Sequence, residues 1–330
     1  MSIKESITSQ MARPQNRVAL ALAIVLVAGV IFNGGGAFFS LGTHRDALRQ
    51  LSVYGILACG MAVVVLSGGI DLAVGSILAL SAVLLSKLLM HHDVAPVLAL
   101  LAVLGTGAAA GLTSGALVSL GRMQAFIATL AVMVSSRGLA KLISGGQKVA
   151  TYVPEGDGTF RTVEVPGLYR AIDSKLFGGA VSVVTLLFIA CFVTTLVLVT
   201  QTKWGREVCA IGGNEEAARL SGIKVKWSKT LAYVYCGLCA SIAGICQAAQ
   251  EQQGDPEAGI GYELTAISMI VMGGMSLAGG RGSVGLALFG ILAIGYLEKI
   301  LSINAVPESG RLLITGAIIV IAVLSQARKQ

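Results

Sequence analysis

Ten apolar segments, each close to the length needed to cross a bilayer, constrain the fold of this chain more than any other feature. A transmembrane helix needs roughly 20 predominantly apolar residues, and inside the hydrocarbon each segment must pair its own backbone amides and carbonyls. The sequence therefore predicts an all-α polytopic membrane protein with about ten transmembrane helices. The predicted spans are residues 18–39, 51–67, 72–90, 94–120, 124–142, 180–200, 229–249, 263–278, 283–302 and 310–325.

The composition agrees with lipid as the solvent for most of the surface. Of the 330 residues, 55% are hydrophobic and 12% are charged, whereas soluble domains carry about 25% charged residues. The net charge of +7 comes from bases scattered between the apolar segments, without the basic stripe of a nucleic-acid-binding surface. We expect contact with the lipid bilayer and no nucleic-acid partner.

The distribution of Lys and Arg predicts the orientation, because these residues accumulate in cytoplasmic segments. Ten spans place both termini on one side, where 13 bases fall, against seven in the segments of the other side. We therefore expect both termini and loop 201–228 in the cytoplasm, and loop 143–179 outside. The 13 are Lys4, Arg13, Arg17, Arg122, Lys203, Arg206, Arg219, Lys224, Lys226, Lys229, Arg281, Arg328 and Lys329; the seven are Arg45, Arg49, Lys148, Arg161, Arg170, Lys175 and Arg311.

Glycine-rich segments follow two of the predicted spans, at residues 67–76 and 273–283. Non-helical backbone is tolerated at membrane depth only where it is buried in protein or lines a water-filled cavity, and broken helices are typical of transporters. We therefore expect broken helices at both glycine-rich turns. Gly107, Gly111 and Gly115 recur at four-residue spacing on another span, which favours close helix packing.

Motifs for catalysis, cofactors and metals are missing or lack the necessary context. Residues 280–285 match G-x-G-x-x-G, but no predicted strand precedes them. The sequence contains no G-x-x-x-x-G-K-[ST] motif, so any ATP that drives this chain is bound by a partner. The three histidines show no metal-ligand spacing with the six cysteines. We expect no catalytic residues, no metal site and no cofactor on the chain itself.

Helix start and stop signals enclose two turns within loop 201–228. Asn214 is a favourable N-cap, Glu215 and Glu216 occupy the first turn, Arg219 comes late, and Gly222 is placed to end the helix. A helix this short is unstable alone. It therefore rests either on the membrane surface and neighbouring loops or on a partner protein in the cytoplasm.

The partner interpretation assigns a small apolar contact face to Ala217, Ala218 and Leu220. The segment that would make this contact comprises Gly213, Asn214, Glu215, Glu216, Ala217, Ala218, Arg219, Leu220, Ser221 and Gly222.

Residues 212–223, with Gly-Gly-Asn followed by Ala-Ala-x-x-Ser-Gly-Ile, resemble the coupling-helix signature of the ribose-type ABC sugar permeases. That family belongs to the branched-chain amino acid and ribose permease superfamily. Residues 69–76, 126–140 and 261–267 are similar to it as well, in family order between about residues 51 and 325. Two features depart from the pattern, namely a longer outer loop at 148–170 and Glu298-Lys299 where the family often has Asn-Gly.

The resemblance implies a single permease domain over residues 1–330, in the bacterial cytoplasmic (inner) membrane. It implies an ATP-binding cassette ATPase subunit that binds the ATP and to which residues 213–222 couple the spans. It also implies a periplasmic sugar-binding protein and a second permease, either an identical copy or a sister chain. The sugar stays open among ribose, xylose, arabinose, galactose, galactofuranose, an autoinducer sugar and a polyol.

Candidate residues for the substrate path or for helix breaks are Asp71, Ser76, Thr129, Arg137 and Glu263, since polar groups within spans are functional candidates. Asp71 either caps the following helix or joins the path, and Glu263 is either a cap or part of an outer vestibule. Arg137, together with Lys141 one turn later, either anchors the outer interface or binds a ligand. Aromatic residues make up 5% of the chain and both tryptophans lie in loop 201–228, so we expect no aromatic sugar platform in the spans.

Two other classes of protein remain as alternatives. An ion-coupled sugar symporter needs acidic groups near the middle of the membrane, and Asp71 is the one deep carboxylate that the sequence offers. A membrane-embedded enzyme needs a catalytic pair, and neither a suitable His/Asp pair nor H-E-x-x-H is evident.

Overall fold

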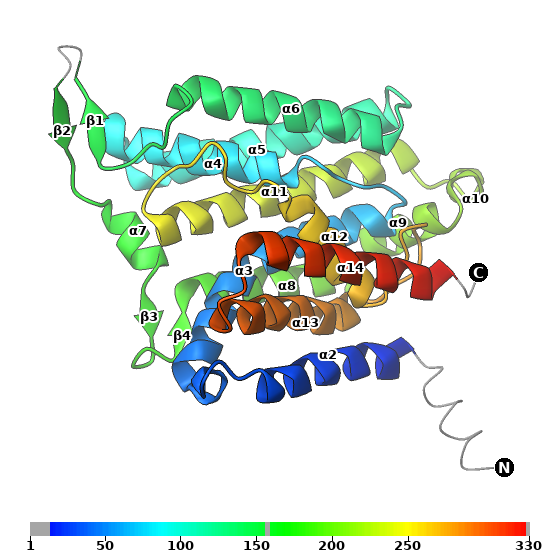
Figure 1. Cartoon of the computed structure of the whole chain (residues 1–330). Helices are drawn as coiled ribbons and strands as arrows, with labels where there is room; N and C mark the ends of the chain where they lie inside the picture. Colours follow the sequence, from blue (N-terminus) through cyan, green and yellow to red (C-terminus); the bar gives the residue numbers. More distant parts are fainter. Residues whose placement is uncertain (1–13, 156–158, 328–330) are drawn as a thin grey trace.

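The computed structural model describes residues 14–155 and 159–327. It is a bundle of helices that run roughly side by side, with two small hairpins at one end and two short helices at the other (Figure 1). The helices are α2 (Pro14–Ile31), η1 (Ala37–Phe39), α3 (Leu41–Leu66), α4 (Val74–Ser86), η2 (Lys87–His91), α5 (Pro96–Ser119), α6 (Ala125–Ser144), α7 (Gly167–Ile172), α8 (Val183–Gln201), α9 (Lys203–Gly213), α10 (Glu215–Leu220), α11 (Val225–Glu251), α12 (Tyr262–Met272), α13 (Val284–Ile303) and α14 (Glu308–Ala327).

Seven helices in the described part of the chain are long and apolar enough to cross a membrane, which confirms a polytopic all-α membrane protein. They are α3, α4 extended by η2, α5, α6, α8, α11 and α13. Apolar helices of fewer residues lie at Gln15–Ile31 and at α12. Each of the ten predicted segments overlaps a helix, but a count of ten crossings stays a prediction.

The first predicted span ends earlier than expected. The apolar sequence continues to residue 39, yet α2 ends at Ile31, and a separate 3-10 turn, η1, follows. Gly34, Gly35 and Gly36 all have positive φ angles, of 58°, 67° and 92°. This left-handed conformation is open to glycine and ends a right-handed helix, so hydropathy alone placed the boundary too late.

The interior of the bundle consists mainly of α3, α4 and α11. Between residues 51 and 66 of α3, every residue is buried except Tyr54. Close contacts between α5 and α11 confirm the predicted role of the glycine series, because Gly107, Gly111 and Gly115 all face the backbone of α11. A methyl group at any of the three would overlap α11. Backbone contact of this kind is how small residues promote helix association in lipid.

The segment between α6 and α8 contains two short hairpins and a short helix. Strand β1 (Tyr152–Pro154) pairs with β2 (Phe160–Thr162), α7 follows, and β3 (Lys175–Leu176) pairs with β4 (Val181–Ser182), both pairs antiparallel. These elements lie at the end of the bundle opposite α9 and α10 (Figure 1).

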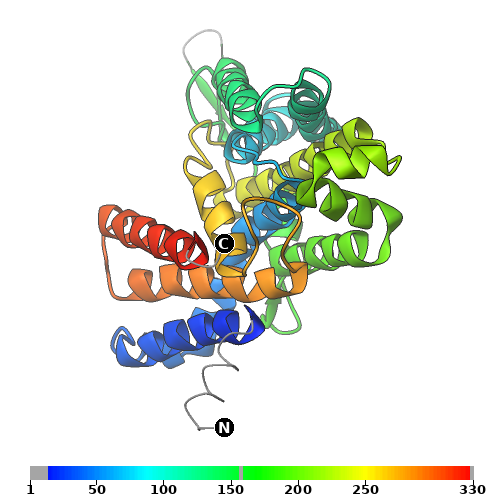
Figure 2. The same ribbon diagram turned by 90° about the vertical axis from the view of Figure 1, so that its right-hand side faces the viewer.

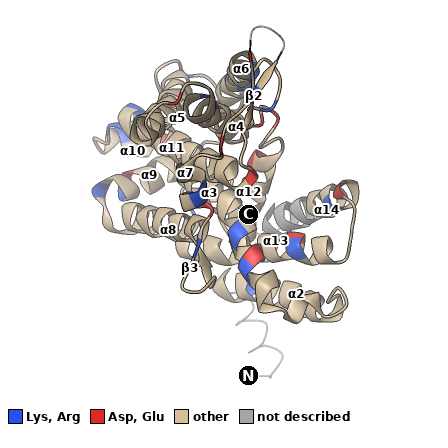
Figure 3. Cartoon of the chain, turned by 90° about the vertical axis from the view of Figure 1, so that its left-hand side faces the viewer, with Lys and Arg blue, Asp and Glu red and all other residues tan. Residues whose placement is uncertain are grey.

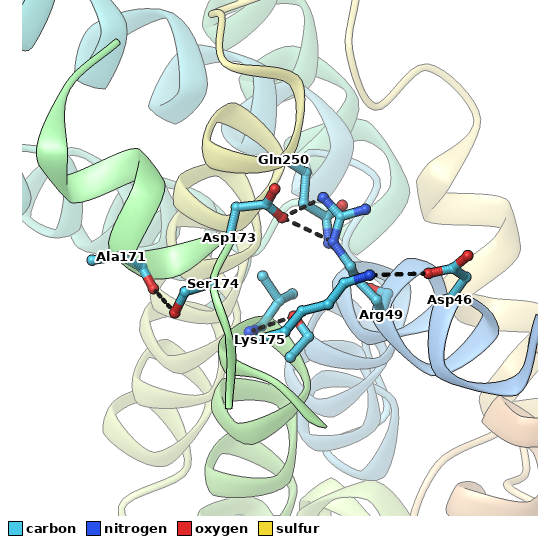
Figure 4. A network of polar contacts seen from close by, with 9 residues as sticks. Asp46, Arg49, Ala171, Asp173, Ser174, Lys175 and Gln250 are labelled. Carbon is cyan, nitrogen blue, oxygen red and sulfur yellow. Dashed lines mark hydrogen bonds and ion pairs between the residues drawn. The ribbon is translucent and has the colours of Figure 1, made fainter. Parts of the chain in front are cut away.

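A network of polar contacts fastens this segment to the helices (Figure 4). The Arg49 side chain of α3 donates from Nε to Asp173 Oδ1 over 2.8 Å, and its backbone carbonyl accepts from Gln250 Nε2 of α11 over 3.2 Å. Lys175 of β3 lies 3.7 Å from Asp46 of α3. The segment is therefore tied to α3 and α11, the two helices at the centre of the bundle.

Charged residues occupy few positions on the helices (Figure 3). The first described residues of α2 and the end of α14 lie at the same end of the bundle as α9 and α10 (Figure 1). Assignment of this end to the cytoplasm, with both termini, stays a prediction from the charge distribution.

Candidate functional site

The short helix predicted after Asn214 is present as α10, and its capping follows the sequence signals. Asn214 Oδ1 accepts a hydrogen bond of 3.0 Å from the Ala217 amide, as an N-cap does. At the other end Gly222 has a φ of 82°, and its amide donates to the Arg219 carbonyl over 3.0 Å. Helix α10 is thus defined by its own caps at both ends.

One ion pair lies within α10 and another connects it to a neighbouring helix. Glu216 and Arg219 pair within the helix, and Arg219 lowers the pKa of the Glu216 carboxyl below its usual value through a hydrogen bond and its charge. Glu215 lies 2.8 Å from Lys229 at the start of α11. The second pair connects the short helix to a helix of the bundle interior.

The exposed face of α10 differs from the predicted one at one residue. Ala218 is buried, because it packs against Ile211 of α9 and Val225 of α11, so its assignment to a partner-contact face is wrong. Ala217 is exposed, and Leu220 is 76% exposed. An exposed leucine on a two-turn helix is an available contact point, and α10 lies at the end of the bundle opposite the hairpins (Figure 1).

A contact made by glycines joins α9 to both glycine-rich segments. Gly212, near the end of α9, packs so closely on the Leu66 carbonyl that a methyl group there would overlap it. Gly279 faces the backbone of Gly68 and of Gly212 in the same way. The Gly280 amide then donates to the Leu66 carbonyl over 3.1 Å. We call these five residues the glycine junction.

The glycine junction connects the segment before α10 to the α3–α4 and α12–α13 connections. Backbones in direct contact leave no flexible side chain to absorb a displacement. The junction is therefore a direct backbone contact between α9 and two connections in the bundle. Sequence patterns had indicated the two glycine-rich segments separately, without their contact with each other or with α9.

A cavity of about 380 Å³ lies between α4, α6 and the start of α12. It brings together three of the five candidate path residues, Ser76, Arg137 and Glu263. Ser76 and Glu263 come from the first turns of α4 and α12, and Arg137 comes from α6. Its lining residues are Ser76, Met133, Val134, Arg137, Gly138, Lys141, Ile260, Gly261 and Glu263.

Arg137 holds the segment 252–261, which connects α11 to α12. Its Nη1 donates to the carbonyl oxygens of Pro256, over 2.5 Å, and Ala258, over 2.7 Å. Lys141 lies 2.6 Å from Glu257 in the same segment. The structure therefore gives Arg137 and Lys141 an anchoring role on this segment, in addition to their place in the cavity wall.

Further contacts attach segment 252–261 to the chain that follows α6. Val149 and Gly254 exchange two backbone hydrogen bonds of 2.8 Å each. Lys148 lies 2.9 Å from Asp255, whose hydrogen bond and charge raise the pKa of the Lys148 ammonium group. Segment 252–261 is thus bound to α6 and its continuation over most of its length.

The remaining two candidate residues lie outside the cavity lining. Asp71 is fully buried, and its Oδ1 accepts from the Ala73 amide just before α4, which corresponds to the predicted capping role. Thr129 is also fully buried and bonds within α6, with its Oγ1 donating to the Ala125 carbonyl over 2.8 Å. Neither side chain is placed to contact a solute in this cavity.

Comparison with known proteins identifies relatives that match this chain over most of its length. The ribose import permease protein of Escherichia coli (strain K12) is 37% identical over 309 residues, which cover 94% of this chain and 93% of the relative. The ribose import permease protein of Bacillus subtilis (strain 168) is 38% identical over 288 residues, 86% of this chain and 84% of the relative. The L-arabinose transport system permease protein of Escherichia coli (strain K12) is 34% identical over 324 residues, which cover 96% of this chain and 91% of the relative.

No solved structure matches the chain significantly. Residues 45–323 match the protein family described as the permease component of the branched-chain amino acid transport system. This match covers most of the chain, from the start of α3 into α14. The chain belongs to this family of transport-system permease components.

Proposed function

We propose that this chain is the transmembrane permease subunit of an ATP-driven ABC importer for a monosaccharide. The similarity to ribose and L-arabinose permeases over most of both chains carries the proposal. The chain forms a single permease domain that spans the inner membrane several times and has both termini in the cytoplasm. A separate ATPase binds the ATP, and a periplasmic binding protein delivers the sugar.

In this proposal α10 is the ATPase contact. A helix of two turns gains little stability from its own hydrogen bonds, yet its caps and its pair with Lys229 keep it at the bundle end. Leu220 and Ala217 present the apolar contact, and the glycine junction passes the displacement to α3, α4, α12 and α13. Closure of the ATPase thereby changes the side of the membrane from which the sugar can enter or leave the path.

The sugar path follows the side of the bundle where the cavity lies. Charged side chains at membrane depth are costly unless they face protein or water, and Arg137 and Glu263 line this cavity. Viewed from the end that carries α9 and α10, α12 lies beside α14 (Figure 2). The start of α12 borders the cavity. A second permease, identical or a sister chain, covers this side and completes the path.

The symporter alternative receives no support from the position of Asp71. A coupling-ion site needs a carboxylate that a solute ion can reach, whereas Asp71 is fully buried and pairs with the Ala73 amide.

Reconstitution tests the proposal. The chain, its ATPase and its binding protein are placed in liposomes, and uptake of labelled D-ribose, L-arabinose and D-galactose is measured with and without ATP. We expect ATP-dependent uptake of at least one sugar that requires the binding protein. Uptake driven by an ion gradient in the absence of the ATPase would contradict the proposal and restore the symporter.

A further inference from the structure

Tyr54 is the one residue between positions 51 and 66 that the central helix α3 leaves partly exposed. Its ring packs on the ring of Tyr262, the first residue of α12, with centroids 4.4 Å apart and planes inclined by 47°. Tyr262 is partly exposed as well. Two helices therefore bring together a partly exposed aromatic pair, although the sequence had suggested that the spans lack one.

Polar side chains from three other helices surround this pair. Gln247 of α11 lies within hydrogen-bonding range of the Tyr262 hydroxyl, and its Nε2 donates to Glu251 Oε1 over 2.5 Å. Gln247 is 9% exposed, so its amide is nearly enclosed. This side of the pair offers an oriented amide and a carboxylate.

Helices α13 and α14 bring two charged side chains, Glu298 and Arg311, close enough to Tyr54 to interact with it electrostatically. Thr315 Oγ1 donates to Glu298 Oε1 over 3.0 Å, and Arg311 Nη1 lies 4.0 Å from Glu298 Oε2. The Arg311 Nε is buried and has no hydrogen-bond partner among the residues that the structure describes. A guanidinium and a carboxylate this close compensate each other's charge, which favours a neutral ligand over an ion.

In the orientation predicted from the charge distribution, the cluster lies within the outer part of the membrane. Tyr54 is five residues inward from Arg49, which pairs with Asp173 of the outer segment, and Glu298 is five residues from the end of α13. At about 1.5 Å per residue both lie roughly 7.5 Å below those levels. Ionisable groups at such depth face protein or water and are functional candidates.

We propose that Tyr54, Tyr262, Gln247, Glu298 and Arg311 form a contact site for the transported monosaccharide. This inference rests on the proposed function and adds the residues that contact the sugar. The C–H face of a sugar ring packs on aromatic rings, while neighbouring hydroxyls match the donors and acceptors of amide, carboxylate and guanidinium groups. Glu263, the neighbour of Tyr262, lines the outer cavity, so the first turn of α12 connects the two places.

The first test compares uptake and ATP hydrolysis in liposomes that contain the permease, its ATPase and its binding protein. The probes are D-ribose, L-arabinose and D-galactose, and the parent chain shows which of them is transported. Tyr54→Leu and Tyr262→Leu should lower the sugar moved per ATP by about tenfold, as loss of an aromatic contact allows. Tyr262→Phe keeps the ring and should retain uptake, and Tyr152→Leu on the outer hairpin is the matched control.

The outcomes separate this inference from the proposed function. If the parent chain moves none of the sugars with ATP, the proposed function fails. If the parent is active and the leucine variants move sugar as it does, the contact site is wrong. A fall in stimulated ATP hydrolysis that matches the fall in uptake also overturns it, because that pattern indicates altered helix packing.

A second test measures the contact directly in the same complex. In a chain with Cys191 and Cys209 replaced by alanine, Tyr262→Cys is labelled by an impermeant thiol reagent from outside. The transported sugar should slow this labelling and should leave the labelling of Tyr152→Cys unchanged. Equal labelling of Tyr262→Cys with and without sugar would overturn the inference.

Discussion

The backbone amide of Gly280 donates a hydrogen bond of 3.1 Å to the carbonyl oxygen of Leu66. This bond joins the end of α3 to the α12–α13 connection, more than 200 positions later in the sequence. Gly212 packs on the same carbonyl. One backbone atom of α3 therefore meets both the α12–α13 connection and the helix that precedes α10. Four of the predictions below concern this end of the bundle.

Substitution of Gly212 should uncouple ATP hydrolysis from transport. The methyl group of Gly212→Ala overlaps the Leu66 carbonyl, and such overpacking costs about 1–3 kcal/mol. We expect sugar uptake per ATP to fall at least severalfold in the reconstituted complex. Gly105→Ala on α5 is the control, because no atom lies within 4 Å of the added carbon. Equal coupling in both variants would refute the transmission role of the junction.

A carboxylate on the exposed face of α10 should break the ATPase contact. Ala217→Asp and Leu220→Asp place a charge without a partner in the expected interface, which costs several kcal/mol when buried. We expect normal amounts in the membrane with loss of uptake and of stimulated ATP hydrolysis. Thr159→Asp in the outer segment serves as control. If both variants transport like the parent while the ATPase still co-purifies, α10 has no coupling role.

Ala218→Asp should behave differently from Ala217→Asp. Ala218 is 4% exposed against Ile211 and Val225, so a carboxylate there disrupts α10 itself. We expect faster proteolysis of the 201–228 loop in inverted vesicles, even without the ATPase. The same cleavage rate as Ala217→Asp would show that Ala218 does not hold the helix in place.

Cys209 reports both orientation and burial. It should react with an impermeant thiol reagent in inverted vesicles and resist it in intact spheroplasts, if loop 201–228 is cytoplasmic. Burial raises the pKa of this thiol, and the thiolate is the reactive form. Its labelling rate should therefore keep rising with pH beyond the point where a free cysteine levels off. Labelling in spheroplasts alone would reverse the orientation.

Loss of Arg137 should loosen segment 252–261. Arg137 makes two charge-assisted bonds to its backbone, each worth about 1.5–3 kcal/mol. The Lys141–Glu257 pair is half-exposed and contributes roughly 0–1 kcal/mol. Arg137→Leu should thus lower the unfolding temperature of the solubilised protein and speed proteolysis of this segment from outside, whereas Lys141→Met should change both little. Similar effects of the two variants would contradict the anchoring role.

The sequence predicted best where the signals are local. The caps of α10 lie within nine residues of each other, and the glycine series of α5 repeats along one helix face, so both were identified correctly. The overlap of every predicted span with a helix has the same origin, because hydropathy is summed over contiguous residues.

Relationships between distant residues escaped prediction. Tyr54 and Tyr262 are paired by the packing of α3 on α12, and no pattern near either residue indicates this. The inward direction of Ala218 depends on contacts with α9 and α11. The end of α2 depended on the φ angles of three glycines, which hydropathy does not report.

The burial of α3 has a consequence for biogenesis. This helix precedes α8, α11, α12 and α13, which cover it, in the sequence and is therefore synthesised before them. Until α11 is made, the apolar surface of α3 must be in contact with lipid or with the insertion machinery. The first half of the chain therefore cannot reach its final packing by itself, and its quality control has to wait for the second half.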